Sequence, residues 1–125
     1  MAFKPFTALV AIVAATTTFA QTDLAQCDFV FIPNGDPSDG NIVADFNYIP
    51  GFAMLSTGDG GEGFIQGATY TEDPEGVFNV HNAFSKVGWT CAQTADFQES
   101  LAGQTLPGAT GFLWTIQSAE CSCDN

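Results

Sequence analysis

The sequence predicts a small, mainly β domain stapled by disulfides: an antiparallel sandwich or barrel with one short helix, or alternatively an α+β arrangement. Short apolar runs alternate with clusters of Gly, Pro, Asn and Asp, at the spacing of small all-β domains. Four cysteines follow an export leader, which favours two disulfides. Nine of the twelve Phe, both Trp and both Tyr lie after residue 20 and supply the apolar volume for a core.

The first two strands are predicted at residues 27–32 and 41–49. The first is nearly continuous apolar sequence and ends at a Pro-Asn-Gly turn. In the second, side chains alternate in the period of a half-buried strand. Ile42, Phe46 and Ile49 would also share one face of a helix, but the β-branched and aromatic content favours a strand.

Four more strands complete the predicted sheet. The pair Pro50-Gly51 suits a type II turn, because glycine there tolerates a positive φ. An acidic turn at residues 72–76 predicts a hairpin between the strands that flank it. The apolar spacing from Val77 to Cys91 fits a helical face as well as a strand. These further strands are predicted at residues 52–57, 64–71, 77–84 and 112–119.

One short helix is predicted at residues 97–102. Asp96 and Glu99 have the spacing of an N-terminal capping box, and Gly103 suits the end of a helix. The triplet Leu106-Pro107-Gly108 then predicts a turn before the last strand.

Residues 1–20 have the pattern of a secretory signal peptide. Lys4 precedes an apolar run, and the small residues Thr18 and Ala20 stand where a signal peptidase would cut. The run is about half of the roughly 20 residues that a membrane span needs. We therefore expect residues 21–125 to form a single acidic, disulfide-bonded domain that is secreted, extracellular and soluble.

The four cysteines lie beyond this leader, where an oxidising compartment favours their pairing. A bridge between Cys121 and Cys123 would close a very short, strained ring. We therefore expect Cys27 and Cys91 each to pair with one of these two cysteines, in either combination. A zinc site at Cys121, Cys123 and His81 is disfavoured, because one distant His lacks zinc-ligand spacing.

Charge limits the partners. Without the leader, Lys86 is the single base against fourteen acids, and the net charge is −13. Nucleic acids and anionic membranes need Lys or Arg to contact their phosphates, so we expect neither as a partner. Self-repulsion at this charge favours a monomer at neutral pH.

The sequence assigns no catalytic residue. His81 is not accompanied by a Gly-x-Ser-x-Gly elbow, and the cysteines are expected to be paired. Asp45, Asp96 and Glu99 are candidate carboxylates for a small acidic glycoside hydrolase, but the sequence does not separate them from ordinary surface acids. We therefore favour a protein that is not an enzyme.

Two kinds of ligand site remain as hypotheses. Calcium, the one cofactor considered, would find oxygen ligands in two Gly-containing loops, although neither loop has EF-hand spacing and both could be solvated turns. Sugar rings could stack on four aromatic residues if one exposed face held them, although a small domain would also use such rings in its core. The candidate calcium ligands are Asp36, Asp39, Asp59 and Glu62, and the candidate sugar-binding rings are Trp89, Trp114, Tyr48 and Tyr70.

In organisation the chain resembles the small secreted proteins of filamentous fungi. The resemblance lies in the short leader ending in Phe19-Ala20, a mature domain near one hundred residues, few cysteines and no enzyme motif. It implies an extracellular, effector-type or growth-associated role and assigns no residues. We expect a secreted non-enzymatic protein that contacts an extracellular protein or polysaccharide through loops 34–41 and 58–63. A carbohydrate-binding module or small glycoside hydrolase is the alternative.

Overall fold

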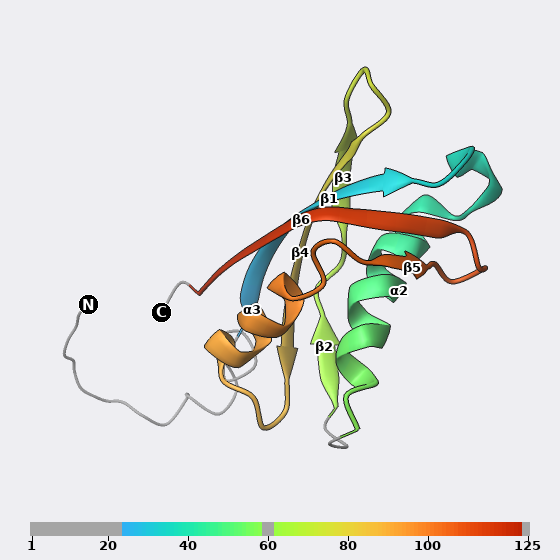
Figure 1. The fold of residues 1–125 in the computed structure, drawn as a ribbon. Coiled ribbons are helices and arrows are strands. Elements are labelled where there is room, and N and C mark those ends of the chain that lie inside the picture. Colours follow the sequence, from blue (N-terminus) through green and yellow to red (C-terminus); the bar gives the residue numbers. More distant parts are fainter. Residues whose placement is uncertain (1–23, 59–61, 124–125) are drawn as a thin grey trace.

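The computed structural model describes residues 24–58 and 62–123, so the predicted leader at residues 1–20 lies outside the described residues. One antiparallel sheet curls into about half a barrel, and two α-helices pack on its inner face (Figure 1). The elements in chain order are β1 (Ala25–Pro33), a 3-10 turn η2 (Pro37–Asp39), α2 (Ile42–Leu55), β2 (Gly63–Ile65), β3 (Thr69–Glu72), β4 (Phe78–Lys86), α3 (Cys91–Glu99), β5 (Thr105–Pro107) and β6 (Leu113–Cys123). Neither helix of this described part has the length and hydrophobicity that crossing a bilayer requires.

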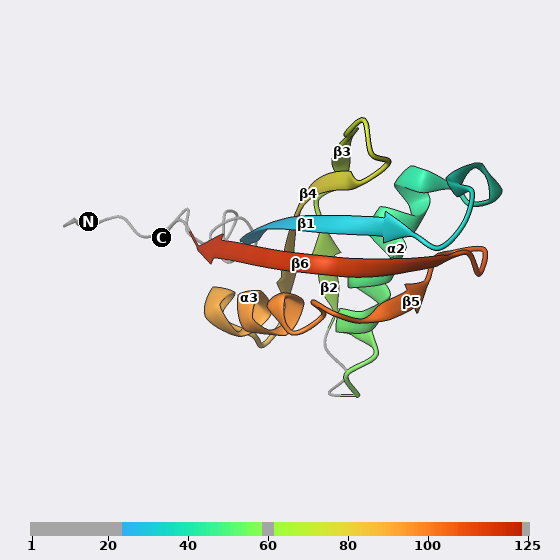
Figure 2. The same cartoon turned by 45° about the horizontal axis from the view of Figure 1, so that its top comes forward.

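The strand order is β2-β4-β1-β6-β5, and β3 also pairs with β4, alongside a different stretch of that strand from β2. The first and last described strands, β1 and β6, lie side by side at the centre of the sheet (Figure 2). Their register runs from Ala25 opposite Cys123 to Pro33 opposite Trp114. The predicted class, a mainly β antiparallel fold with two disulfides, is confirmed, with a second helix that was not predicted.

A bulge in β6 keeps the inner face apolar. The register with β1 pairs Val30 with Ser118 but Phe31 with Ile116, so Gln117 is an extra residue. Without that residue, strict alternation would direct the apolar side chains at one end of β6 to the outer face of the sheet. Because of it, both Ile116 and Ala119 pack against the core.

The core is built from aromatic rings of the sheet and of α2. Phe46 lies with its ring centroid 4.8 Å from Phe31, 4.8 Å from Trp114 and 5.7 Å from Phe78. All four side chains are fully buried. Burying a Phe side chain contributes about 1.5–3 kcal/mol, so this cluster contributes substantially to the packing of α2 on the sheet.

The predicted strands at residues 41–49 and 52–57, and the turn between them, are wrong: the whole stretch is the helix α2. Asn41 caps it, since its side-chain oxygen accepts a hydrogen bond from the Ala44 N–H at 3.3 Å. The segment is apolar on nearly every side, so its sequence pattern does not distinguish the period of a strand from that of a helix. Helical spacing buries Phe46, Ile49 and Met54 together.

Pro50 and Gly51 sit inside α2 because tertiary packing outweighs their low helix propensity. A Cβ on Gly51 would come within 2.3 Å of Ile65 Cδ1, so glycine lets β2 approach the helix. The Pro50 carbonyl accepts a hydrogen bond from Gln98 Nε2 of α3 at 3.2 Å. The Pro-Gly pair therefore marks a crossing of three elements rather than a turn.

Other predictions hold in part. The strands predicted at residues 77–84 and 112–119 are confirmed as β4 and β6, and the acidic turn joins β3 to β4. The strand predicted at residues 64–71 is divided into β2 and β3. Between them the N–H groups of Gly67 and Ala68 leave the ladder and donate to the side-chain oxygens of Asn82 and Asn47, each at 2.9 Å.

The helix predicted at residues 97–102 is wrong in its limits, because α3 runs over Cys91–Glu99. The capping box consists of Thr90 and Gln93: the Gln93 N–H donates to Thr90 Oγ1 at 3.1 Å, and the Thr90 N–H donates to Gln93 Oε1 at 2.8 Å. Asp96 lies within the helix and does not cap it. The turn predicted at residues 106–108 is also wrong in its limits, because Leu106 and Pro107 belong to β5, which pairs with β6, and the chain turns at residues 109–111.

The two disulfides confirm that Cys27 and Cys91 each bond to a C-terminal cysteine. Cys27 pairs with Cys121, its direct neighbour across β1 and β6, with Cα atoms 4.0 Å apart. Cys91 pairs with Cys123 and so fastens the start of α3 to the end of β6. Both bridges fix the last strand, one within the sheet and one to a helix.

Candidate functional site

The outer face of the sheet, opposite the helices, holds a hollow of about 620 Å³. We call it the outer groove. It crosses four neighbouring strands, β3, β4, β1 and β6, and its floor is made by every second residue of each. Most of these side chains are polar, in contrast to the apolar inner face.

One line of four side chains runs across the groove. The register places Thr69 beside His81, His81 beside Asp28, and Asp28 beside Glu120. We call these four residues the central row. A second line beside it consists of Thr71, Asn79, Val30 and Ser118.

His81 is held on both sides by oxygen atoms. Its Nδ1 lies 2.8 Å from Asp28 Oδ1, and its Nε2 lies 3.0 Å from Gln26 Oε1. A protonated ring donates to both oxygens, whereas a neutral ring that donates to Asp28 needs the Gln26 amide to turn its NH₂ group inward. Either state keeps the ring in the same place.

The His81–Asp28 pair orients side chains more than it stabilises the fold. The two side chains are 46% and 77% exposed, so solvent screens their attraction. The hydrogen bond from His81 involves one of the two Asp28 oxygens, and most of the Asp28 side chain is exposed to solvent. The carboxylate can therefore accept further hydrogen bonds from a partner.

An Asp and a His in contact are two parts of a catalytic triad, but the third is not in place. In a triad, the ring nitrogen remote from the Asp takes a proton from a Ser or Thr hydroxyl. Here that nitrogen contacts the Gln26 amide instead. All four cysteines are in disulfides, so the groove has no thiol nucleophile either.

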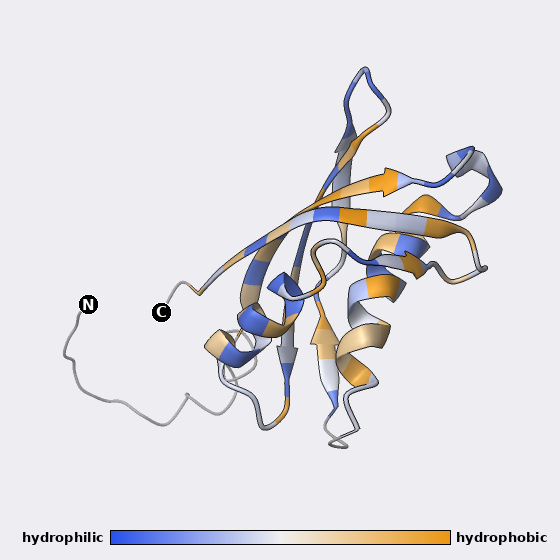
Figure 3. Cartoon of the chain, in the orientation of Figure 1, coloured by the Kyte–Doolittle hydropathy of each residue, from blue (hydrophilic) through white to orange (hydrophobic). Residues whose placement is uncertain are grey.

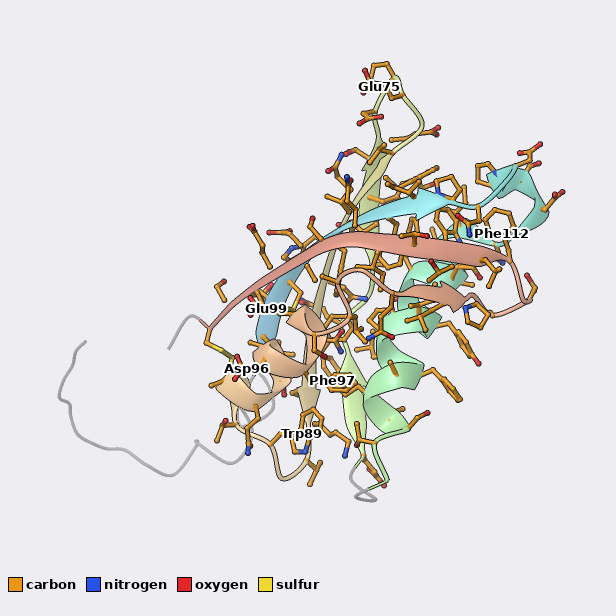
Figure 4. The ribbon with its side chains drawn as sticks, viewed as in Figure 1. Glu75, Trp89, Asp96, Phe97, Glu99 and Phe112 are labelled. Atoms are coloured by element: carbon orange, nitrogen blue, oxygen red, sulfur yellow. A yellow bond between two sulfur atoms is a disulfide. The ribbon has the colours of Figure 1, made fainter. Side chains whose placement is uncertain are left out.

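The three carboxylates considered for glycoside hydrolysis do not share a site. Asp45 is fully buried under the sheet, where it accepts hydrogen bonds from the Ala109 N–H at 2.8 Å and the Trp114 indole N–H at 2.9 Å. Asp96 and Glu99 project from α3 (Figure 4), and Glu99 accepts from the Cys121 N–H at 2.8 Å. The buried Asp45 cannot contact a substrate from its present position.

The proposed calcium ligands that the structure describes lie in two different parts of the fold. Asp36 accepts hydrogen bonds from the Ser38 N–H at 3.0 Å and from the Ser38 hydroxyl at 2.9 Å. Both lower the pKa of the Asp36 carboxyl, the backbone N–H more than the hydroxyl. Asp39 lies in the same 3-10 turn, Glu62 lies beyond α2, and Asp59 is outside the described residues. Within residues 24–58 and 62–123, no three acidic, His or Cys side chains are grouped as metal ligands.

The four predicted sugar-binding rings do not form a platform. Trp114 is fully buried, Tyr70 packs on the core rings of Phe46 and Phe78, and Trp89 is half-buried beside Phe97 (Figure 4). Tyr48 stacks on the exposed Phe52, with ring centroids 5.1 Å apart, and is itself about as exposed as Tyr70. The Tyr48–Phe52 pair borders a small apolar hollow of about 210 Å³ between α2 and β5.

Sequence reasoning missed the central row. Its members lie on four strands, and Asp28 is 53 residues from His81. The one available signal was the alternation of polar residues in β1, where Gln26 and Asp28 stand between buried neighbours. Strand order, which brings the row together, cannot be read from that alternation.

No protein-family model, curated protein or solved structure matches this chain.

Proposed function

We propose that this chain is a secreted, non-enzymatic binding protein whose outer groove takes a cationic segment of an extracellular protein. The central row supports the proposal most directly, because it places the carboxylates of Asp28 and Glu120 side by side at an open surface. An Arg guanidinium or a Lys ammonium is the side chain that such a pair favours.

The charge of the whole chain supports a cationic partner. Fourteen acids stand against two bases. One of these, Lys86, is only 3% exposed and lies with Nζ 4.8 Å from the centroid of the Trp89 ring, and its single positive charge leaves the domain strongly acidic. A surface of one sign attracts an oppositely charged segment and accelerates its association.

A protein partner is favoured over a polysaccharide. The outer groove supplies hydroxyl, amide and carboxylate oxygens, which could also bind sugar hydroxyls. Two rings border it: Phe29 is buried, whereas Tyr70 packs on core rings with part of its surface and is 39% exposed. The groove therefore offers a pyranose one partly covered ring rather than the open aromatic surface on which sugars stack, and its carboxylates favour a cationic protein segment.

The test is binding of a short Lys- and Arg-containing peptide to the wild-type protein and to the double variant D28N/E120Q. We expect the variant to bind about tenfold more weakly at low salt, because it loses two charge-assisted hydrogen bonds. The control variant D39N/D96N removes the same charge from exposed positions outside the groove. Equal weakening by both double variants, or no binding by the wild type, would refute the proposal.

A glycoside hydrolase is the second candidate, and one observation favours it. Asp28 and Glu120 are direct cross-strand neighbours, whose Cβ atoms stand about 4.5–5.5 Å apart, so the carboxyl separation of retaining enzymes, about 5–5.5 Å, is within reach of the two side chains. A screen against plant and fungal polysaccharides decides between the two functions. Hydrolysis that D28N/E120Q abolishes and D39N/D96N retains would establish the enzyme.

A further inference from the structure

We infer that the cationic segment binds as an added β-strand along the free edge of β3. This inference deepens the proposed function and rests on it for the charge of the segment. The features that carry it are the exposed edge of β3, the phase of its hydrogen bonds and its position at the rim of the outer groove.

β3 is an edge strand. It pairs with β4 on one side, and within the described residues no strand pairs with it on the other. All four of its residues are exposed, and none is a proline, which would remove a hydrogen-bond donor. An exposed strand edge is a template for pairing with another chain.

The phase of the ladder shows which backbone groups are free. The Asp73 N–H donates to the Val77 carbonyl at 2.9 Å, which marks a hydrogen-bonded pair at the end of the hairpin. Such pairs recur at every second residue of an antiparallel ladder. Thr71 and Thr69 therefore direct their backbone groups toward β4, and Tyr70 and Glu72 direct theirs outward.

Two contacts elsewhere in the sheet agree with this phase. Continued across β4 and β1, it makes His81–Asp28 and Cys27–Cys121 non-hydrogen-bonded pairs, whose side chains approach most closely. The first pair is in contact at 2.8 Å, and the second forms a disulfide with Cα atoms 4.0 Å apart. The outward N–H and carbonyl groups of Tyr70 and Glu72 are thus placed to bond an added strand.

Charge selects the occupant of this edge. Glu72, Asp73 and Glu75 lie together at the hairpin, with Glu75 at its tip (Figure 4). A second copy of this acidic chain would be repelled there, whereas a segment with Lys or Arg would be attracted. In strand addition the main chain supplies affinity and alternate side chains supply specificity, so we expect cationic residues at alternate positions.

The geometry also sets a length for the segment. Thr69 belongs both to β3 and to the central row, so a segment paired with β3 lies at the rim of the groove. Asp28 is two strands beyond β3, so it lies three strand spacings, or about 14 Å, from a strand added outside β3. An extended chain covers that distance in about four residues. A segment that pairs with β3 and then reaches Asp28 needs about eight residues in all, since strands of three to four residues already pair.

The test uses a fluorescent peptide of about eight alternating Lys and Thr residues and the full-length protein, with affinity read by anisotropy. Two further peptides carry N-methyl groups, one on every Lys amide and the other on every Thr amide. We expect one of them to bind at least tenfold more weakly than the parent and the other to bind within about twofold, because only alternate amides face β3. Equal binding by all three peptides would overturn strand addition.

A protein-side comparison uses Glu72→Pro and Glu72→Gln. Both remove the charge, but only the proline removes the outward N–H, and it costs no hydrogen bond to β4. We expect Glu72→Pro to bind the parent peptide about tenfold more weakly than Glu72→Gln, and equal affinity would count against strand addition. Should the proline variant fail to fold, the methylated peptides still decide the question on the wild-type protein.

These outcomes separate the two proposals. No binding of the parent peptide, or no effect of D28N/E120Q on its affinity, refutes the proposed function of the groove. If D28N/E120Q weakens peptide binding but neither set of N-methyl groups weakens it, the added strand at β3 is refuted and the proposed function of the groove is not. Sedimentation that shows a wild-type dimer which Glu72→Pro dissociates would assign the edge to a second copy and overturn the inference.

Discussion

The two faces of the sheet use the same strands for different purposes. In β1 the inward residues Ala25, Cys27 and Phe29 are buried, whereas Gln26 and Asp28 between them face the other way and contact His81. Colouring by hydropathy shows the same alternation of apolar and polar residues along the strands (Figure 3). Neighbouring residues of one strand are therefore under different constraints: one must pack in the core, and the next contacts solvent or a partner.

The largest effect is expected from Phe46→Ala on the inner face. It removes a fully buried ring from the aromatic cluster and should cost about 3–5 kcal/mol in the free energy of unfolding. Asn79→Ala on the outer face is the matched comparison and should change it by about 0.5 kcal/mol or less. Urea denaturation measures both. Similar losses in the two variants would contradict the division between the faces.

The disulfides are expected to rank next. Replacing each bonded pair by alanines, as C27A/C121A or C91A/C123A, should cost about 2–4 kcal/mol in the free energy of unfolding. The first pair closes the longer loop, with a sequence separation of 94 against 32. On the chain-entropy account its loss should cost roughly 1 kcal/mol more. The reverse order in urea denaturation would show that contacts of the Cys91–Cys123 bridge, not loop length, dominate.

Asp45→Asn tests a polar group on the inner side. One oxygen of the buried carboxylate accepts from the Ala109 N–H and the other from the Trp114 indole. The amide NH₂ would face one of these donors, so we expect a loss of about 1.5–3 kcal/mol. Asp28→Asn, the same change on the outer face, should cost about 0.5 kcal/mol or less, because that side chain is exposed. Comparable losses from chemical denaturation would refute the contrast.

The smallest effect is expected from Asp36→Asn, in an exposed loop. Hydrogen bonds from the Ser38 N–H and hydroxyl lower the pKa of Asp36, so its ionised form is favoured in the folded state. That contribution is present above the ordinary Asp pKa and is lost as pH falls through the lower, folded-state value. The stability difference between wild type and Asp36→Asn should therefore shrink in acid. An NMR titration in which the Ser38 amide does not follow the Asp36 carboxyl would contradict this coupling.

The contrast between the faces also explains what the sequence could predict. The strands β1, β4 and β6 were recognisable because their apolar runs end at local turn signals. The disulfide partners were narrowed by one local argument, the strain of a Cys121–Cys123 ring. The helix α2 was not recognisable, since a segment apolar on nearly every side has no clear period and contains a Pro-Gly pair that resembles a turn.

The outer groove was beyond reach for a different reason. His81 was identified as a lone histidine, and its partners Gln26 and Asp28 lie more than fifty residues away in sequence. Their contact depends on β1 pairing with β4 and not with its neighbours in the chain. Non-local strand order of this kind is set by the whole core, which no single segment contains.

The central place of β6 has a consequence for how the chain folds. The strand that starts the described domain and the strand that completes it are partners in the middle of the sheet. During synthesis β1 is made first, but its partner β6 is not available until residue 123 has been added. Pairing of such distant segments is slow, because a long loop must be closed before any contact is gained. The Cys27–Cys121 bond can then form only late in folding, and it would stabilise strand pairing that is already in place.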